Sequence, residues 1–121
     1  MTRPTDMPVT GPAATTRLAV YGTLAPGQIN HDQLAHLSGC WTKGSVRGQL
    51  VNHGWGADHG CPGLRLDGAS GLIDVSILTS DDLPSFWKTL DAFEGDGYRR
   101  VVTQAQTEHG ALDVHIYEVK L

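Results

Sequence analysis

The sequence predicts an α+β domain in which a mixed or closed sheet packs on one principal helix. In residues 72–78 and 112–119, large aliphatic side chains recur at alternate positions that would lie on one face, which is the two-residue period of a strand. Between them, residues 81–93 carry large apolar side chains at the 3.6-residue period of a helix. The chain has 121 residues, of which 40% are hydrophobic, so it can bury one core but not two. We therefore expect a single folded unit.

The N-terminal residues differ in composition from the rest of the chain. Residues 1–16 are rich in proline and threonine and lack the apolar stretch of a secretion signal, which predicts a disordered tail. The folded domain is expected over residues 17–121. It begins with an apolar run at residues 17–21 that stops at Gly22, the pattern of a buried strand entering a turn.

The remaining elements before and after the principal helix are shorter. A short helix is expected over residues 30–37, and alternation predicts a strand over residues 43–51. Residues 52–63 are rich in glycine and indicate a loop. Near the C-terminus, residues 100–106 are expected to pair with the last strand through a turn at residues 108–110.

The principal helix has clear signals at both ends. Ser80, Asp81 or Asp82 can cap its start, and Pro84 falls in the first turn, where a missing N–H is tolerated. Gly95 follows its end and can take a left-handed conformation. The apolar positions that define its buried face are Leu83, Phe86, Trp87, Leu90 and Phe93.

Composition argues against several classes of partner. The net charge is −4 and charged residues are scattered, so no basic stripe predicts nucleic-acid binding. No run approaches the roughly 20 apolar residues of a membrane-spanning helix. Two cysteines, Cys40 and Cys61, are too few for a disulfide framework, and we expect both to be reduced in a cytoplasmic protein.

The turn after the first strand is a candidate anion-binding site. Main-chain N–H groups of Gly22, Thr23 and Leu24 can point outward where a glycine leaves room, which suits a carboxylate or an oxyanion. A strand followed by a glycine is, however, commonly just a turn. Tyr21 beside it can equally be a core aromatic residue.

Glu94 is the candidate general base. It falls at the C-terminal end of the principal helix, where the macrodipole disfavours a carboxylate, and it follows the apolar Phe93. Dipole and desolvation should both raise its pKa above the reference of about 4.3, as a general base requires. The alternative is an exposed glutamate that pairs with Arg99 or Arg100.

Two motifs in this order resemble the gamma-glutamylcyclotransferase-like family. The first is Val-Tyr-Gly-Thr-Leu-x-x-Gly at residues 20–27, with an Asn-His pair after it. The second is Leu-Asp-x-Phe-Glu-Gly-x-x-Tyr-x-Arg at residues 90–100, and between them a Pro-Gly pair at residues 62–63 precedes a strand. The resemblance spans residues 17–119.

This resemblance implies both a fold and a site. The fold is a small mixed β-barrel with one principal helix and short flanking helices. The site is a pocket in which Glu94 is catalytic and the early turn binds the substrate through its backbone. The implied substrate-binding residues are Tyr21, Gly22, Thr23, Leu24 and Tyr98.

The implied reaction is the cyclisation of a small gamma-glutamyl compound. Its own α-amine attacks the γ-carbonyl, which closes a lactam and releases 5-oxoproline with an amine or amino acid. Glu94 would move the proton from the attacking amine to the departing nitrogen, and main-chain N–H groups would hold the carboxylate or the developing oxyanion. Such a reaction requires no cofactor.

Other interpretations of these residues stay open. The same pocket suits a non-catalytic binding module that holds a carboxylate-bearing small ligand. The strand at residues 71–75 lacks the Gly-Glu-Leu-Tyr pattern common in the family, so the choice of substrate is open. Arg100 is expected to brace the loop through a carboxylate. His53, His59 and Cys61 are separated by glycines without metal-ligand spacing, and we predict no metal site.

Overall fold

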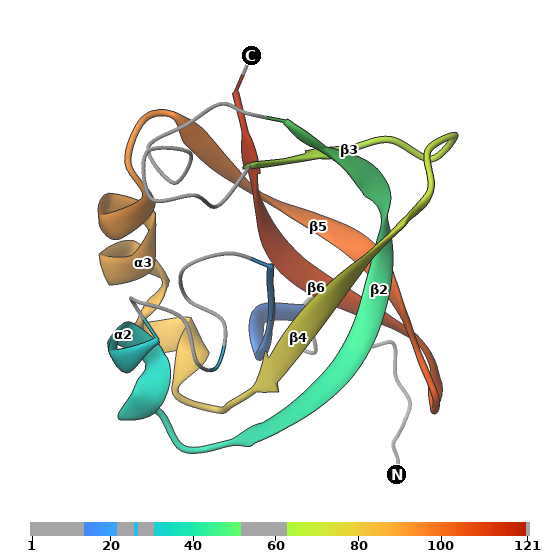
Figure 1. Cartoon of the computed structure of the whole chain (residues 1–121). Helices are drawn as coiled ribbons and strands as arrows, with labels where there is room; N and C mark the ends of the chain where they lie inside the picture. The colour runs from blue at the N-terminus through green and yellow to red at the C-terminus, as the bar shows by residue number, and fades with distance from the viewer. Residues whose placement is uncertain (1–13, 22–25, 27–30, 52–62, 121) are drawn as a thin grey trace, which may run out of the picture.

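A closed ring of five strands forms the body of the protein in this computed structural model (Figure 1). The structure describes residues 14–21, 26, 31–51 and 63–120. In chain order the elements are β1 (Arg17–Val20), α2 (Asp32–Ala35), β2 (Cys40–Val51), β3 (Gly63–Leu66), β4 (Leu72–Thr79), the 3-10 helix η2 (Leu83–Ser85), α3 (Trp87–Glu94), β5 (Tyr98–Thr107) and β6 (Gly110–Val119).

The sheet is mixed, as the sequence predicts. Its strand order is β3-β2-β4-β1-β6-β5, and β2 also pairs with β5, which closes the barrel. The strands β1 and β6 are parallel, whereas the other pairs are antiparallel. The closure rests on one bridge, between Ser45 and Gln106. The predicted small mixed β-barrel with one principal helix is confirmed.

The strand boundaries lie close to those predicted from alternation. Strand β4 extends the expected strand by one residue, and β6 extends the last one by two residues at its start. Gly110 has a φ of 104°, and its carbonyl accepts a hydrogen bond from the Thr107 hydroxyl (2.8 Å), so the hairpin turn falls where it was predicted. Residues 52–62 of the predicted loop lie outside the described residues.

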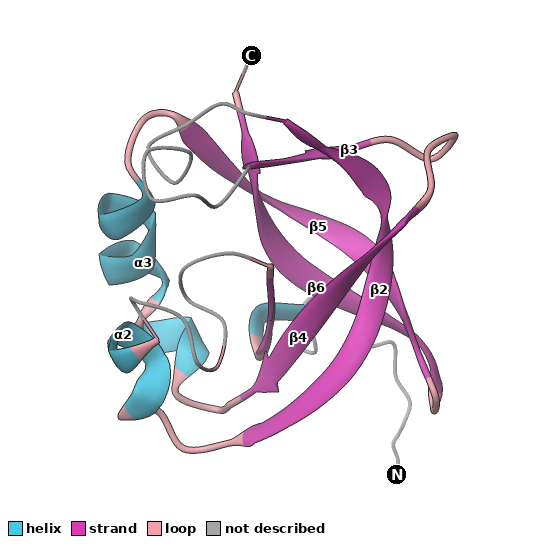
Figure 2. Ribbon diagram, viewed as in Figure 1, coloured by secondary structure: helices cyan, strands magenta, loops and turns pink. Residues whose placement is uncertain are grey.

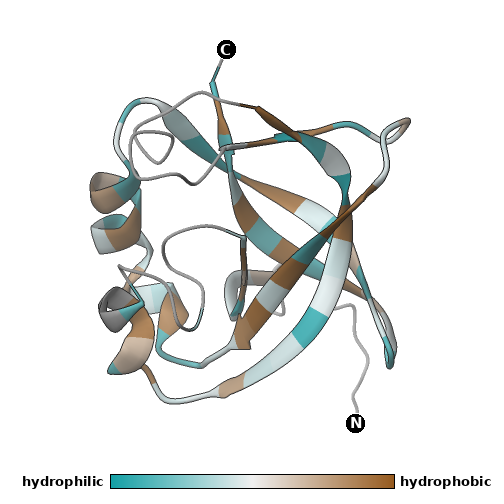
Figure 3. Ribbon diagram, in the orientation of Figure 1, coloured by the Kyte–Doolittle hydropathy of each residue, from teal (hydrophilic) through white to brown (hydrophobic). Residues whose placement is uncertain are grey.

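Two apolar cores lie on the two faces of this curved sheet. Alternation sends one set of side chains into the barrel and the other set outward toward the helices. The helices α2 and α3 lie on one side of the barrel (Figure 2). Hydrophobic and hydrophilic residues follow one another along the strands (Figure 3). The barrel core comprises Ala19, Val46, Leu64, Val75, Ile77, Ala105, Val114 and Ile116. The outer core comprises Leu18, Val20, Leu34, Leu78, Leu83, Trp87, Leu90, Tyr98, Tyr117 and Val119.

The principal helix is shorter than predicted, and its expected start at residue 81 is wrong. The N–H of Phe86 donates to the carbonyl of Leu83, which is 3-10 bonding, and the α-helix begins only at Trp87. Ser80 contributes to this local arrangement, because its hydroxyl accepts a hydrogen bond from the N–H of Asp82 (3.1 Å) and its carbonyl accepts one from the N–H of Leu83 (3.3 Å). The predicted apolar face is nevertheless the buried one.

The segment immediately before β1 packs on the body of the protein. Ala14 is buried, and the carbonyl of Thr15 accepts a hydrogen bond from the Trp87 indole (3.0 Å). The carbonyl of Thr16 accepts one from the N–H of Ser80 (2.8 Å). These are the last three residues of the predicted tail, and residues 1–13 lie outside the described residues. No helix in the described ranges is long and apolar enough to cross a membrane.

Candidate active site

Glu94 ends α3 and is buried. Glu94 is buried together with Trp87 and Leu90 of the same helix, and it is only 8% exposed. Gly95 comes next with a φ of 81°, and its N–H donates to the carbonyl of Asp91 (3.0 Å). The chain then turns directly into β5. The helix end therefore holds the carboxylate against the barrel.

Burial changes the acidity of Glu94. Desolvation raises the pKa of its carboxyl from 4.5 to about 7. This is the direction predicted from the sequence, where the helix macrodipole was expected to contribute as well. A carboxyl with a pKa near neutrality can accept and return a proton at physiological pH.

The alternative of an exposed Glu94 is wrong. The two arginines considered for it have other carboxylate partners. Arg99 donates to Glu118 (Nε to Oε1, 3.0 Å), and Arg100 donates to both oxygens of Asp91 (2.9 and 3.2 Å). Arg100 thus braces the segment after α3 through a carboxylate, as expected.

Tyr21 lies in the same region as Glu94. Burial raises the pKa of its phenol, and the negative charges of Glu94 and Glu118 raise it further. Its hydroxyl donates to the carbonyl of Tyr117 (2.7 Å) and accepts from the N–H of Leu64 (3.1 Å). One side chain therefore joins the end of β1 to β3 and β6 beside the acid.

Tyr98 begins β5 and is buried at 8% exposure. Its N–H donates to the carbonyl of Gly95 (3.3 Å), so the turn that follows Glu94 is closed by this residue. The phenol of Tyr98 also acts electrostatically on Tyr21. The structure thus brings together Tyr21, Glu94 and Tyr98, although 73 positions separate the first two in sequence.

Part of the predicted site lies outside the described residues. This applies to Gly22, Thr23 and Leu24 of the early turn, and also to His53, His59 and Cys61 of the glycine-rich segment. Within the described ranges, no group of three His, Cys, Asp or Glu side chains is arranged to hold a metal ion. Cys40 is described and is a free, exposed thiol.

Sequence reasoning did not identify Tyr117 and Glu118 as residues of this region. The Tyr117 hydroxyl donates to Asp91 (2.7 Å), while its carbonyl accepts from Tyr21. Glu118 is buried, and its carboxylate accepts from the N–H of Leu66 (3.0 Å) and from Arg99. The alternation of β6 places Tyr117 on the face under α3, but its partners are distant in sequence.

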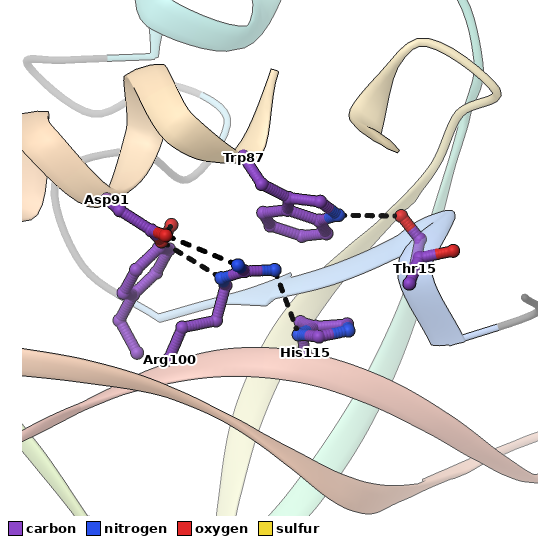
Figure 4. A network of polar contacts seen from close by, with 6 residues as sticks. Thr15, Trp87, Asp91, Arg100 and His115 are labelled. Carbon is purple, nitrogen blue, oxygen red and sulfur yellow. Dashed lines mark hydrogen bonds and ion pairs between the residues drawn. The ribbon is translucent and has the colours of Figure 1, made fainter. Parts of the chain in front are cut away.

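A polar network continues from Asp91 along the outer face of the barrel. Figure 4 shows Arg100 between Asp91 and His115, with Trp87 above it. The guanidinium carbon lies 4.4 Å from the Trp87 ring centroid, and Nη1 lies 3.4 Å from Nδ1 of His115. Burial and the nearby Arg100 charge lower the pKa of His115. This network fixes α3 on β5 and β6.

Two open hollows in the described part of the molecule flank the bridge between β2 and β5. One is lined by residues such as Arg47 and Gln104, and the other by residues such as Trp41 and His109. Neither is lined by Tyr21, Glu94 or Tyr98. The candidate site is therefore the region of the buried acid and neither of these hollows.

The model of one protein family, gamma-glutamyl cyclotransferase, AIG2-like, matches residues 18–121. The chain belongs to the gamma-glutamyl cyclotransferase, AIG2-like family. The resemblance inferred from the two motifs is thereby confirmed. No curated protein sequence matches this family member.

Solved structures share the fold of this AIG2-like chain. YkqA from Bacillus subtilis has a TM-score of 0.69 and 25% identity, over 88% of this chain and 36% of its own. An AIG2-like protein from Mus musculus has a TM-score of 0.67 and 26% identity, over 86% of this chain and 76% of its own. An uncharacterized protein from Pyrococcus horikoshii has a TM-score of 0.58 and 22% identity, over 87% of this chain and 80% of its own. At this identity the likeness shows the fold alone. The chain spans only 36% of the length of YkqA.

Proposed function

We propose that this protein is a gamma-glutamyl cyclotransferase. The α-amine of a gamma-glutamyl compound attacks its own γ-carbonyl, so that a bond forms between this nitrogen and the γ-carbon. The bond from the γ-carbon to the leaving nitrogen then breaks. The products are 5-oxoproline and a free amine or amino acid. The attacking group belongs to the substrate, so the protein has to orient it and move protons.

The observation that carries this proposal is the buried Glu94 with a pKa of about 7. In its ionised form the carboxylate takes a proton from the attacking amine, and in its protonated form it gives one to the departing nitrogen. A carboxyl at the ordinary value of 4.5 would be a poor donor at neutral pH. The reaction transfers no electrons, so we propose no cofactor.

Tyr21 and Tyr98 would line the substrate pocket beside this acid. The hydroxyl of Tyr21 already donates one hydrogen bond and accepts one from described residues, which leaves it one lone pair. That lone pair suits a hydrogen bond from the substrate α-ammonium. Main-chain N–H groups of Gly22, Thr23 and Leu24 would hold the substrate carboxylate or the developing oxyanion, a role that rests on the sequence motif.

Membership of the family supports a cyclotransferase-like enzyme. The mouse neighbour is described as an AIG2-like protein. For this chain we propose a small-molecule gamma-glutamyl substrate, without a role for nucleic acid or a membrane. The cytoplasm, where such compounds and reduced thiols occur together, is the proposed location.

The decisive experiment is a product assay with a panel of gamma-glutamyl amines and gamma-glutamyl amino acids. Wild-type protein should release 5-oxoproline from at least one of them. Glu94→Gln should lower kcat on the order of 10²- to 10⁴-fold, because the amide cannot accept the proton. Glu108→Gln, in the exposed β5–β6 turn, is the matched control and should leave kcat unchanged.

Two results would count against this proposal, the first against the activity and the second against the role of Glu94. Substrate binding by calorimetry without any product would favour the non-catalytic module that holds a carboxylate-bearing ligand. Undiminished turnover by Glu94→Gln would remove this residue from its proposed role.

A further inference from the structure

We propose that Tyr117 is a positioning residue for Glu94, because its two polar ends tie the helix that carries the acid to the strands that line the site. The inference rests on the proposed function insofar as Glu94 is the proton-transfer group. It adds a residue that neither motif contains, since Tyr117 lies beyond residues 90–100.

Tyr117 makes hydrogen bonds through both its main-chain carbonyl and its side-chain hydroxyl. Its main-chain carbonyl accepts the hydrogen bond of the Tyr21 hydroxyl (2.7 Å), and Tyr21 in turn accepts from the N–H of Leu64. Its own hydroxyl donates to Oδ1 of Asp91 in α3 (2.7 Å). A continuous chain of hydrogen bonds therefore runs from β3 through β1 and β6 to the helix.

Asp91 is the point where this chain meets the helix. It lies three residues before Glu94, and its main-chain carbonyl accepts the N–H of Gly95. Its carboxylate also receives the two bonds from Arg100, whose guanidinium lies over Trp87. The last turn of α3 is thus held from two sides, by Arg100 of β5 and by Tyr117 of β6.

These contacts of Asp91 with β5 and β6 matter because α3 is short. A helix of eight residues has little stability of its own and depends on packing. Glu94 is the final residue, and the glycine after it gives no side-chain contact to restrain the end. Without the Tyr117 hydroxyl, Asp91 keeps the Arg100 pair but loses its tie to β6, and we expect the helix end to shift outward so that water reaches the Glu94 carboxyl.

The surroundings of Glu94 allow this shift to be measured. Among the described residues, Glu94 acts electrostatically on Tyr21, just after β1, and on Tyr117 of β6. Tyr98 of β5 and Glu118 of β6 also act on Tyr21, and Asp91 of α3 and Arg100 of β5 act on Tyr117. Burial raises the pKa of Tyr21 and of Tyr117, so both phenols stay neutral from pH 4 to 9. A titration of the Glu94 carboxyl in that range therefore reports its own solvation.

The test is Tyr117→Phe, which keeps the buried ring and the main-chain carbonyl and removes only the hydroxyl. Carboxyl ¹³C NMR should show the Glu94 pKa falling by about one unit or more from about 7, since hydration favours the charged form. The kcat for 5-oxoproline release should fall about tenfold with little change in KM, the cost of about 1.4 kcal/mol.

Three further variants extend the comparison. Ser85→Ala removes a hydroxyl that donates to the carbonyl of Asp82 (3.0 Å) in η2, outside this chain of bonds, and should leave the Glu94 pKa and kcat unchanged. Asp91→Asn retains an oxygen that can accept from Tyr117, so its effect on the Glu94 pKa should be smaller than that of Asp91→Ala.

The NMR titration separates this inference from the proposed function. If wild-type protein releases no 5-oxoproline but Tyr117→Phe lowers the Glu94 pKa, the cyclotransferase proposal fails and the positioning role stands. If Tyr117→Phe leaves the Glu94 pKa at the wild-type value, the positioning role is overturned. That holds even where the variant is less stable, because a brace alone would cost stability without changing the titration.

Discussion

At the scale of single residues, the environment of Glu94 decides what its carboxyl can do. A glutamate at a helix end is ordinarily solvated and ionised at neutral pH. Here the residue is 8% exposed, and desolvation brings its pKa to about 7. Tyr21, whose own pKa is raised partly by this acid, lies within its electrostatic reach. The burial that raises the pKa of Glu94 also makes the free energy of unfolding depend on pH.

The pH dependence of stability should reveal this burial. Between pH 4.5 and 7 the folded state holds the Glu94 proton and the unfolded state releases it, so this group makes unfolding easier as pH rises. The free energy of unfolding of Glu94→Gln, relative to wild type, should therefore increase across this window by about 3 kcal/mol. Urea denaturation from pH 4 to 8 measures it.

The control for that measurement is Glu108→Gln, at a position 81% exposed in its side chain. Its difference from wild type should stay flat with pH. The lowered pKa of Asp67 acts in the opposite sense, but it is common to all three proteins and cancels. A flat difference for Glu94→Gln as well would contradict the burial of this carboxyl.

At the scale of elements, the end of α3 is set by backbone conformation. Gly95 has a φ of 81° and a ψ of −174°, a region that residues with a Cβ atom avoid. The sequence predicts a glycine closing the helix, and the positive φ confirms it, although ψ is extended and not left-handed helical. This conformation lets the chain leave the helix and enter β5 within three residues.

Gly95→Ala should destabilise the fold by about 1–3 kcal/mol, because the added methyl group strains this backbone conformation. A Cβ at this position would meet no atom within 4 Å, so the cost comes from the backbone and not from a clash. Gly97→Ala is the matched control, since that glycine has equally open surroundings and no positive φ. Thermal denaturation of both variants measures the difference, and equal melting temperatures would contradict the assignment of strain.

At the scale of the whole molecule, the barrel closes at a narrow seam. Only Ser45 and Gln106 bridge β2 and β5 among the described pairs, and Gly44 lies next to this bridge. A Cβ on Gly44 would lie 2.9 Å from the Gln106 carbonyl oxygen and 2.9 Å from Cδ1 of Ile77. The absence of a side chain there lets the two strands approach.

Gly44→Ala should therefore widen the seam and lower the free energy of unfolding by about 1–3 kcal/mol, the usual cost of overpacking. Gly68→Ala, in open space between β3 and β4, serves as the control and should change stability by less than about 0.5 kcal/mol. Hydrogen exchange should show faster exchange for residues of β2 and β5 near the bridge. Unchanged exchange and stability in Gly44→Ala would show that the seam tolerates the methyl group.

Local periodicity determined much of this protein. The alternation of residues 72–78 and 112–119 and the helical spacing of residues 81–93 define strands and a helix, because such patterns depend on neighbours along the chain. The helix start was the exception, since 3-10 bonding around Pro84 replaced the predicted first turn. The position of Glu94 after an apolar helix face indicated a raised pKa but left open an exposed glutamate paired with an arginine, and the burial of Glu94 in the fold excludes that alternative.

The family resemblance implied Tyr21 and Tyr98 beside that acid, but only the tertiary structure added Tyr117 and the hydrogen bonds that hold these groups. Tyr21, Asp91, Tyr98 and Tyr117 come from four different elements, and their partners lie up to 96 positions apart in sequence. No periodic pattern encodes a hydrogen bond of this kind, because it forms only after the barrel closes and the helix packs on it. The sequence thus indicated which acid matters, whereas the folded chain determined that it is buried and how it is held.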